Sequence, residues 1–305
     1  MASTLITVAD TTARDALSPA VGDTVYQIDN KKINVCSSLG PVVWQTYDPD
    51  DNTGWADSSI TGISGIHTWW DSNYDANMFT DAGVTNAALG DRLYQWTDRI
   101  NSRALVQSAT TTRPIWANEG KNGRPRVVFD GTSPDQMDYA IPDTSQSVDW
   151  ADCIVAIAIR NLTFDDAGGY FNYDYSSQDI FSNYASTTLN TATYKAKAGT
   201  KTVYSNLDNT NQFDTLILAT NTSSNYTKLY RNGTDVTANA SGVATAATAP
   251  TGTFMDSATN FRIPYQQTME YYEWIIVNAA ATPAVCQTIN AYWAAKYDIT
   301  VGTIS

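Results

Sequence analysis

The sequence predicts an all-β protein, an antiparallel β-sandwich that carries one helix near its C-terminus. Three observations lead to this fold class. Short runs of β-branched and aromatic residues recur from residue 66 onward, with Gly, Asn and Asp turn signals between them. No helical periodicity alternates with these runs, as a parallel α/β sheet would require. The 305 residues include 18 Tyr, 9 Trp and 8 Phe, which is enough for one large sandwich core and a small module.

The first 50 residues are predicted to form a small module of their own. Asp10 or Thr11 can cap a short helix that reaches Leu17, and Pro19 ends it. Three short strands are expected at residues 24–28, 33–36 and 42–47. Because three short strands bury little apolar surface, we expect this module to dock on something larger.

Residues 51–65 are predicted to be a linker, because the chain is polar and rich in turn signals there. The sandwich is expected to occupy residues 66–305. Its clearest strands are expected at residues 126–129, 153–159, 215–219, 228–230 and 271–277. Asn232-Gly233 predicts a tight hairpin turn, because both residues readily adopt positive φ.

One helix is predicted near the C-terminus. Thr282 is a good N-cap, and Pro283 suits the first helical position. Val285 and Ile289 begin an apolar stripe at helical spacing that continues to Tyr297. We expect this stripe to pack on the edge of the sandwich.

Charge and cysteine content exclude several functions. The net charge is −13 and no cluster of Lys or Arg occurs, so binding to nucleic acid, which needs cations to replace counterions, is not expected. No apolar run is long enough to span a membrane, and the N-terminus lacks the features of a signal peptide. Cys36, Cys153 and Cys286 are far apart and are expected to be buried free thiols.

The main segment resembles the concanavalin A-like lectin/glucanase (laminin-G-like) domains over about residues 66–300. The residues that carry the resemblance are Trp69-Trp70-Asp71, Val84, Trp96-Thr97-Asp98, Ala104-Leu105, Arg113-Pro114, the run from Asn122 to Gly131, the run from Glu273 to Asn278, and Trp293-Ala294-Ala295-Lys296-Tyr297. The resemblance implies a jelly-roll β-sandwich. It implies little about activity, because this fold hosts many functions.

The first 50 residues resemble a short module of phage tail-fibre and head-decoration proteins. The resemblance rests on the run from Ala13 to Leu17, the run from Pro19 to Tyr26, and Trp44. It implies a role in attachment or oligomer contacts. The turn Ser38-Leu39-Gly40-Pro41 departs from the Asp-Gly-Ser that the family usually has before its Trp.

Glycosidases of the resembled fold use two carboxylates from one strand. Glu270 and Glu273 are the nearest candidates, but three positions apart on a regular strand they would point to opposite faces. We therefore interpret Glu273 as a structural strand residue. His67, the only histidine, lacks a nucleophile motif beside it and is interpreted as a strand residue next to the Trp pair. No catalytic residue is expected.

Two binding hypotheses remain open. Asp48, Asp50 and Asn52 alternate like the start of a calcium loop, but Ser59 stands where that loop needs Glu, so an acidic linker is favoured and neither metal nor cofactor is expected. Tyr170, Tyr173 and Tyr175 could stack on sugars, although cross-strand packing of these rings is the favoured interpretation.

These observations predict a structural protein of the phage virion surface, not an enzyme. It would decorate or cement the capsid, or form a short head or tail fibre, with weak adhesion to host glycans. The expected partners are the phage major capsid or tail protein, sister subunits in a homotrimer, and host polysaccharide. Without an export signal, the chain is expected to assemble into particles in the host cytoplasm. The alternatives are a carbohydrate-binding lectin or adhesin and, third, a polysaccharide-degrading enzyme.

Overall fold

The structure is a computed structural model of the 305-residue chain. It describes residues 5–8, 13, 17, 24–27, 32–39, 42–47, 57–118, 120–130, 137–140, 147–162, 169–173, 178–185, 192–198, 201–205, 212–224, 226–237, 253–254, 260–263 and 268–305. The chain divides into two compact units, Met1–Asp57 and Ser58–Ser305.

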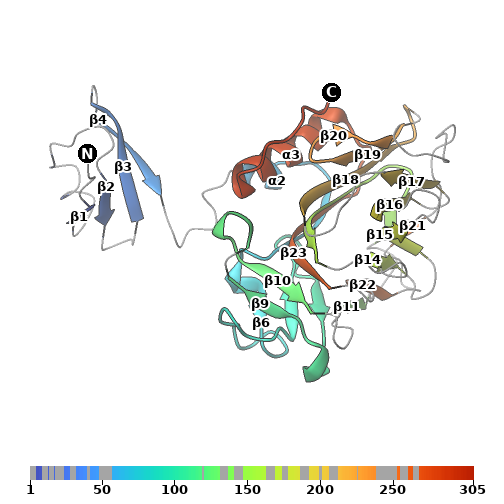
Figure 1. The fold of residues 1–305 in the computed structure, drawn as a ribbon, viewed down its shortest axis with the longest axis horizontal. Coiled ribbons are helices and arrows are strands. Elements are labelled where there is room, and N and C mark those ends of the chain that lie inside the picture. The colour runs from blue at the N-terminus through green and yellow to red at the C-terminus, as the bar shows by residue number, and fades with distance from the viewer. Residues whose placement is uncertain are drawn as a thin grey trace. The chain divides into compact units, whose positions relative to one another are not determined.

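The N-terminal unit contains a four-stranded sheet in the order β1-β2-β3-β4 (Figure 1). The strands are β1 (Leu5–Val8), β2 (Thr24–Gln27), β3 (Lys32–Leu39) and β4 (Val42–Tyr47). The three predicted strands are present. β1 is an additional strand that pairs with β2 in parallel, which local sequence could not predict. The predicted helix after Asp10 lies outside the described residues, apart from Ala13 and Leu17.

The second unit is the predicted all-β sandwich, in which two large sheets lie face to face (Figure 1). The eight-stranded sheet has the order β20-β19-β18-β13-β23-β10-β9, and β5 pairs with β23 beyond the end of β10. Its strands are β5 (Ile66–Asp71), β9 (Ile115–Ala117), β10 (Arg126–Phe129), β13 (Ile154–Asn161), β18 (Phe213–Asn221), β19 (Tyr226–Arg231), β20 (Thr234–Asp235) and β23 (Met269–Val277). The strands predicted at 126–129, 153–159, 215–219, 228–230 and 271–277 all belong to this sheet.

The nine-stranded sheet has the order β17-β16-β15-β14-β22-β11-β8-β7-β6. Its strands are β6 (Met78–Phe79), β7 (Gln95–Thr97), β8 (Ala104–Val106), β11 (Met137–Ala140), β14 (Gly169–Tyr173), β15 (Gln178–Ala185), β16 (Ala192–Ala198), β17 (Lys201–Ser205) and β22 (Asn260–Ile263). All neighbouring strands whose pairing is described in this sheet are antiparallel. A separate pair joins β12 (Val148–Asp149) to β21 (Thr253–Phe254).

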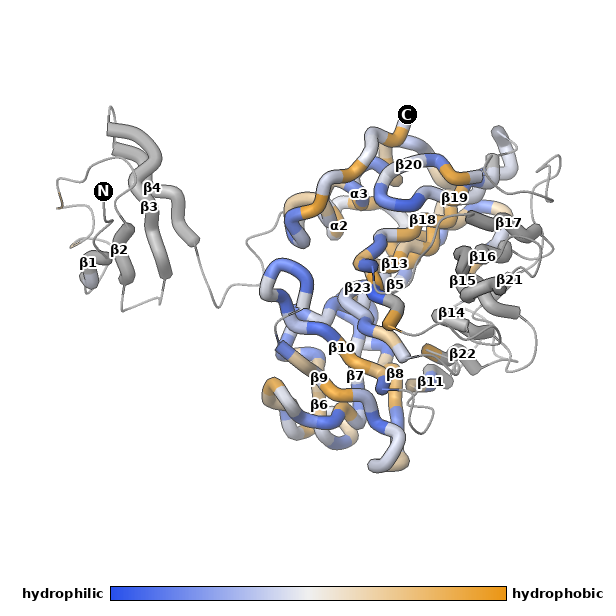
Figure 2. The backbone as a smooth tube through the Cα atoms, viewed as in Figure 1, coloured by the Kyte–Doolittle hydropathy of each residue, from blue (hydrophilic) through white to orange (hydrophobic). Residues whose placement is uncertain are grey.

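The hydrophobic core lies between the two sheets. Trp70, Trp274 and Ile157 come from the eight-stranded sheet, and Trp96 and Leu105 come from the nine-stranded sheet. Trp70 and Trp274 are register partners on β5 and β23, with ring centroids 5.0 Å apart. Figure 2 shows apolar residues concentrated along β13 and β18, as expected for strands buried on both faces.

The C-terminal helix α3 (Pro283–Tyr297) begins and ends where the sequence predicted. The side chain of Thr282 accepts a hydrogen bond from the amide of Val285, and Asp298 ends the helix in the left-handed conformation. The predicted docking position was wrong, because α3 packs on the outer face of the eight-stranded sheet and not on its edge (Figure 1). Strand residues on that face, including Glu273, hydrogen-bond to the helix and draw it over the sheet.

The smaller elements follow local rules. Asn232 and Gly233, with φ of 50° and 74°, form the predicted hairpin turn between β19 and β20. The short helix α2 (Asp57–Thr61) lies within the stretch predicted as a linker and buries Ile60. Single 3-10 turns occur at η1 (Asp75–Asn77), η2 (Thr110–Thr112) and η3 (Lys121–Gly123). In the part of the chain that the structure describes, no helix has the length and apolar character needed to cross a membrane.

Candidate functional site

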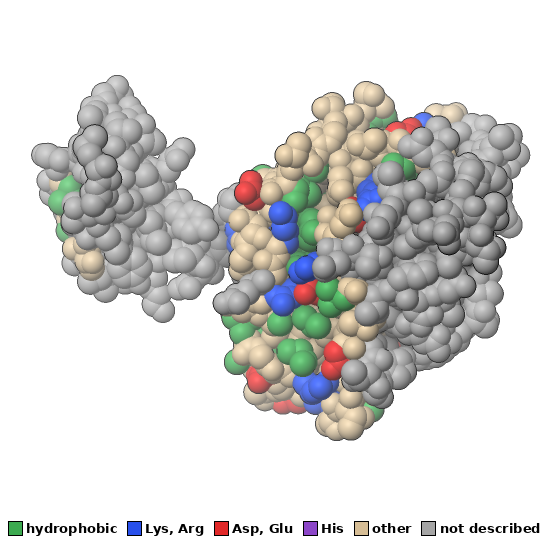
Figure 3. Space-filling view, in the orientation of Figure 1, with side chains coloured by type: hydrophobic (Ala, Val, Ile, Leu, Met, Phe, Trp, Pro, Cys, Tyr) green, Lys and Arg blue, Asp and Glu red, His purple; other side chains and the backbone are tan. Residues whose placement is uncertain are grey.

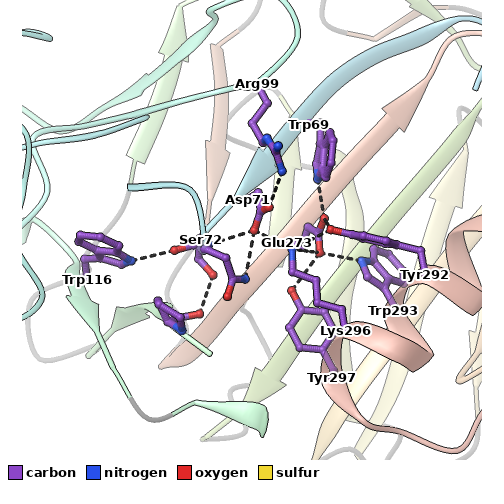
Figure 4. A network of polar contacts seen from close by, with 12 residues as sticks. Trp69, Asp71, Ser72, Arg99, Trp116, Glu273, Tyr292, Trp293, Lys296 and Tyr297 are labelled. Carbon is purple, nitrogen blue, oxygen red and sulfur yellow. Dashed lines mark hydrogen bonds and ion pairs between the residues drawn. The ribbon is translucent and has the colours of Figure 1, made fainter. Parts of the chain in front are cut away.

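A buried group of ionisable side chains lies between α3 and the eight-stranded sheet (Figure 4). Asp71 on β5 and Glu273 on β23 are register partners, so the two carboxylates stand side by side. Lys296 reaches between them from the last turn of α3. All three side chains are at most 1% exposed. We call Asp71, Glu273 and Lys296 the buried triad.

Glu273 accepts hydrogen bonds from five donors. Its Oε1 accepts from the indole of Trp69 and from the hydroxyl of Tyr292, the latter at 2.9 Å. The donors to Oε2 are Trp293 Nε1 at 3.0 Å, Tyr297 Oη at 2.9 Å and Lys296 Nζ at 3.1 Å. Four of the five come from α3, so this single carboxylate fixes the helix on the sheet.

Asp71 is held from the opposite side. Its Oδ1 accepts from Lys296 Nζ at 2.9 Å and from the amide and side chain of Asn73, and its Oδ2 accepts from Arg99 Nη1 at 2.9 Å. The Arg99 guanidinium stacks on Trp69 and Tyr74, 4.0 and 4.4 Å from their ring centroids. Two cations thus balance two carboxylates in a region closed to solvent, which is the condition for keeping charges buried.

The electrostatics of the two carboxylates differ. Burial raises the pKa of Glu273, and the Asp71 charge adds to this effect while Lys296 opposes it. Burial also acts to raise the pKa of Asp71, but Lys296, Arg99 and the bonds from its neighbours outweigh it and hold that pKa below its usual range. Asp71 is therefore the more strongly ionised of the pair.

Glu270 and Glu273 do not point to opposite faces, so that prediction was wrong. The pairing of β13 with β23 shifts between Ala158 and Ile159, which leaves Tyr272 as the extra residue of a β-bulge. Tyr271 and Trp274 therefore both face the core, while Glu270 and Glu273 share the outer face. Glu270 is bonded to Arg126 Nε at 2.8 Å and to the Tyr272 hydroxyl at 2.7 Å.

The remaining candidates fall in three places. His67 lies on β5, as predicted, where its ring and its carbonyl both meet Arg103. Tyr170 and Tyr173 lie on β14, in the interior of the nine-stranded sheet, and Tyr175 lies outside the described residues. The calcium hypothesis at Asp48, Asp50 and Asn52 also lies outside the described residues.

Two of the three cysteines can be placed fully. Cys153 and Cys286 are buried free thiols, and burial raises the pKa of each to about 12. Cys36 lies on β3, and its side chain is outside the described part of the chain.

The sequence did not single out Asp71 and Lys296 as a site. Both stood inside segments that carried the fold resemblance, Trp69-Trp70-Asp71 and the end of the helix, and so did Glu273. The available signal was a lysine on the otherwise apolar side of a helix, since Lys is almost never fully buried without a partner. Its partner is 225 positions away, so the pairing needed the tertiary fold.

No known protein family matches the sequence, and no curated protein matches it. Solved structures do match by shape. Trypanosoma rangeli sialidase in complex with sialic acid is 9% identical, with a TM-score of 0.46, over 90% of this chain and 44% of the sialidase. Domain 4 of an extracellular arabinanase from Geobacillus stearothermophilus, in complex with arabinotriose, is 12% identical, with a TM-score of 0.44, over 74% of this chain and 97% of that domain. The binding domain of Paraclostridial Mosquitocidal Protein 1 is 10% identical, with a TM-score of 0.44, over 67% of this chain and 50% of that one. The chain spans less than half of the sialidase.

These structures correct the prediction that the chain is not an enzyme. The matched structures include a sialidase and domain 4 of a GH43 extracellular arabinanase.

Proposed function

We propose that the sandwich is a carbohydrate-binding domain that contacts glycans through the nine-stranded sheet around β14. One observation carries the proposal, namely the contrast between the strand sequences of the two sheets. β13, β18 and β23 in the eight-stranded sheet are apolar over most of their length and lie between the core and α3. β14 to β17 instead mix aromatic residues with Asn, Gln, Asp, Ser and Lys. A sheet with that composition suits one face in the core and one face open to water or ligand.

The residue types on these strands suit sugar recognition. Aromatic rings can cover the apolar faces of sugars, and amide or carboxylate groups can bind their hydroxyls. β14 carries Tyr170, Phe171, Asn172 and Tyr173 in succession. Tyr173 is the register partner of Phe261 on β22, so the centre of the sheet brings aromatic positions from distant parts of the chain together.

The test is a screen of the full chain against bacterial surface polysaccharides on a glycan array, followed by calorimetry on each hit. We expect binding that weakens at least several-fold in Tyr170→Ala and Tyr173→Ala, because each truncation removes a stacking surface. Val84→Ser is the control, since Val84 is exposed and follows β6, an edge strand of the same sheet that is not a neighbour of β14. A complete lack of hits would reject the proposal.

The same samples test hydrolysis. Release of reducing ends from a polysaccharide that binds would show that the protein hydrolyses this glycan. Glu273 is not a candidate catalytic carboxylate, because it is buried beneath α3 and both of its oxygens accept hydrogen bonds from the helix. A catalytic carboxylate would have to be sought by substituting the acidic residues of the nine-stranded sheet, of which Asp179 on β15 is one.

A second proposal concerns the setting in which the sugar is bound. We propose that the chain belongs to the surface of a phage particle, where the N-terminal unit docks on the major capsid or tail protein and sister subunits form a trimer. The supporting observation is that Met1–Asp57 forms a compact unit distinct from the sandwich, with a four-stranded sheet of its own. Mass spectrometry of purified virions tests this proposal, and absence of the chain from particles would reject it.

Electrostatics agree with a neutral ligand. Among the described residues on the face shown in Figure 3, acidic and basic side chains lie among neutral ones. The net charge of −13 adds a general repulsion toward polyanions. We therefore expect neutral polysaccharides to bind more tightly than highly anionic ones.

A further inference from the structure

The buried triad places an amine against a carboxyl group with a second carboxyl group beside both. Lys296 Nζ is 2.9 Å from Asp71 Oδ1, 3.1 Å from Glu273 Oε2 and 2.7 Å from the hydroxyl of Tyr292 (Figure 4). We propose that Lys296 and Asp71 react to form an intramolecular amide bond between Nζ and Cγ, with Glu273 as the group that relays protons. This inference does not depend on what the nine-stranded sheet binds.

The reaction balances without any added reactant. Before the reaction, the ammonium group of Lys296 carries three protons on Nζ and the carboxylate of Asp71 carries none. One proton passes directly from Nζ to Oδ1, which leaves a neutral amine and a carboxylic acid. The nitrogen lone pair then attacks Cγ, a second proton moves through Glu273 to Oδ1, and the bond from Cγ to Oδ1 breaks. Oδ1 departs as water, and the third hydrogen stays on the amide nitrogen.

Asp71 is placed to be the electrophile. Arg99 Nη1 donates to Oδ2, the oxygen that becomes negative when nitrogen adds to Cγ. The guanidinium cation therefore stabilises the negative charge of the tetrahedral intermediate. The amide and side chain of Asn73 fix the carboxyl plane from its other side. The amine and the carboxyl group are thus in hydrogen-bonding contact before reaction, in the range where an intramolecular step gains most from proximity.

Glu273 is placed to move the proton. One of its oxygens contacts Lys296 Nζ directly, and the other accepts from Tyr292, whose hydroxyl also accepts from Nζ. Burial raises the pKa of Glu273, which brings its protonated and ionised forms closer in free energy, as a proton relay needs. Its remaining donors, Trp69, Trp293 and Tyr297, keep the carboxyl group in position.

The surroundings favour the amide product. The triad is closed to solvent, and the rings of Tyr292 and Tyr297 lie 5.1 and 5.7 Å from Nζ. Because the site is dry, no bulk water competes with Nζ for Cγ. Exclusion of water also protects the product from hydrolysis. The bond would close a loop between residues 225 positions apart and join β5 covalently to α3.

Intact-mass spectrometry of the full chain, unfolded in denaturant, decides the question. We expect the wild-type chain to be lighter than its sequence mass by one water molecule. The Lys296→Arg variant, which lacks the amine, should have its own full sequence mass. Proteolysis should then yield a branched peptide that contains both Asp71 and Lys296. A wild-type chain at its full sequence mass would overturn the proposal, and this measurement needs no variant to fold. A branched peptide joining Lys296 to Glu273 would overturn the assignment of Asp71 as the electrophile.

Two variants probe the roles separately. Asp71→Asn should lose ammonia instead of water, so its joined chain should have the same mass as the joined wild-type chain. Glu273→Gln should stay at full mass while the far-ultraviolet circular dichroism spectrum shows that it folds. A folded Glu273→Gln chain that still forms the bond at the wild-type rate would overturn the relay role.

Discussion

The two sheets of the sandwich differ in the residue types of their strands, and a helix packs on the more apolar one. The eight-stranded sheet lies between the core and α3, and every residue of β23 is buried. Its outer face is held by a charged network on Asp71, Glu273 and Lys296. The nine-stranded sheet contributes Trp96, Leu105 and Ile263 to the core, while β14 to β17 carry mixed aromatic and polar sequences. The eight-stranded sheet is thus built for burial under a helix, whereas β14 to β17 carry the residue types on which the proposed glycan site rests.

The largest effect is expected at the centre of the helix-backed sheet. Glu273→Ala leaves five buried donors without their acceptor, so we expect the sandwich to lose about 3–5 kcal/mol of unfolding free energy. Thermal and denaturant unfolding followed by circular dichroism measure the loss. Asp75→Ala, which removes an exposed carboxylate on η1 outside this network, serves as the control. A change in Glu273→Ala within the error of that control would show that the network does not hold α3.

The same residue should make stability depend on pH. Folding raises the pKa of Glu273 above its ordinary value of 4.5, so folding favours the protonated form. The resulting stability is fully present below pH 4.5 and is lost as pH rises through the pKa in the folded state. We expect the melting temperature of the wild type to fall across that window and the fall to be reduced in Glu273→Gln. Parallel pH profiles for the two proteins would contradict this assignment.

A smaller effect is expected where α3 begins. Thr282→Ala removes the N-cap that accepts from Val285, which should cost about 1 kcal/mol. Thr288→Ala is a matched control in the same helix, because Thr288 bonds only to the carbonyl of its own helix at Ala284. Denaturant midpoints of the two variants compare the cap with the helix surface. Equal midpoints would mean that the buried network alone determines the position of the helix.

The smallest effect on stability is expected in the nine-stranded sheet. If β14 presents a binding face, Tyr173→Ala should change the unfolding free energy by only about 0.5 kcal/mol, as surface substitutions usually do. The same variant should weaken glycan binding measured by calorimetry. A loss of stability as large as that of Glu273→Ala would show instead that Tyr173 packs in the core and that β14 does not present it to a ligand.

Local sequence determined the elements of this protein. Apolar runs bounded by turn residues predicted β10, β13, β18, β19 and β23, because burial on a pleated sheet needs that pattern wherever the strand is placed. The N-cap at Thr282 and the turn at Asn232-Gly233 also follow from the preferences of single residues. The all-β class came from the same signals.

Tertiary structure alone decided how these elements meet. The bulge at Tyr272 depends on the register between β13 and β23, so the shared face of Glu270 and Glu273 could not be derived from their spacing. The burial of Lys296 between two carboxylates depends on its contact with Asp71 across 225 positions, which no local pattern records. Sequence specifies which residues must be buried or turned, because those are local free-energy preferences. Which charges end up facing one another is settled only when the sheets and the helix pack.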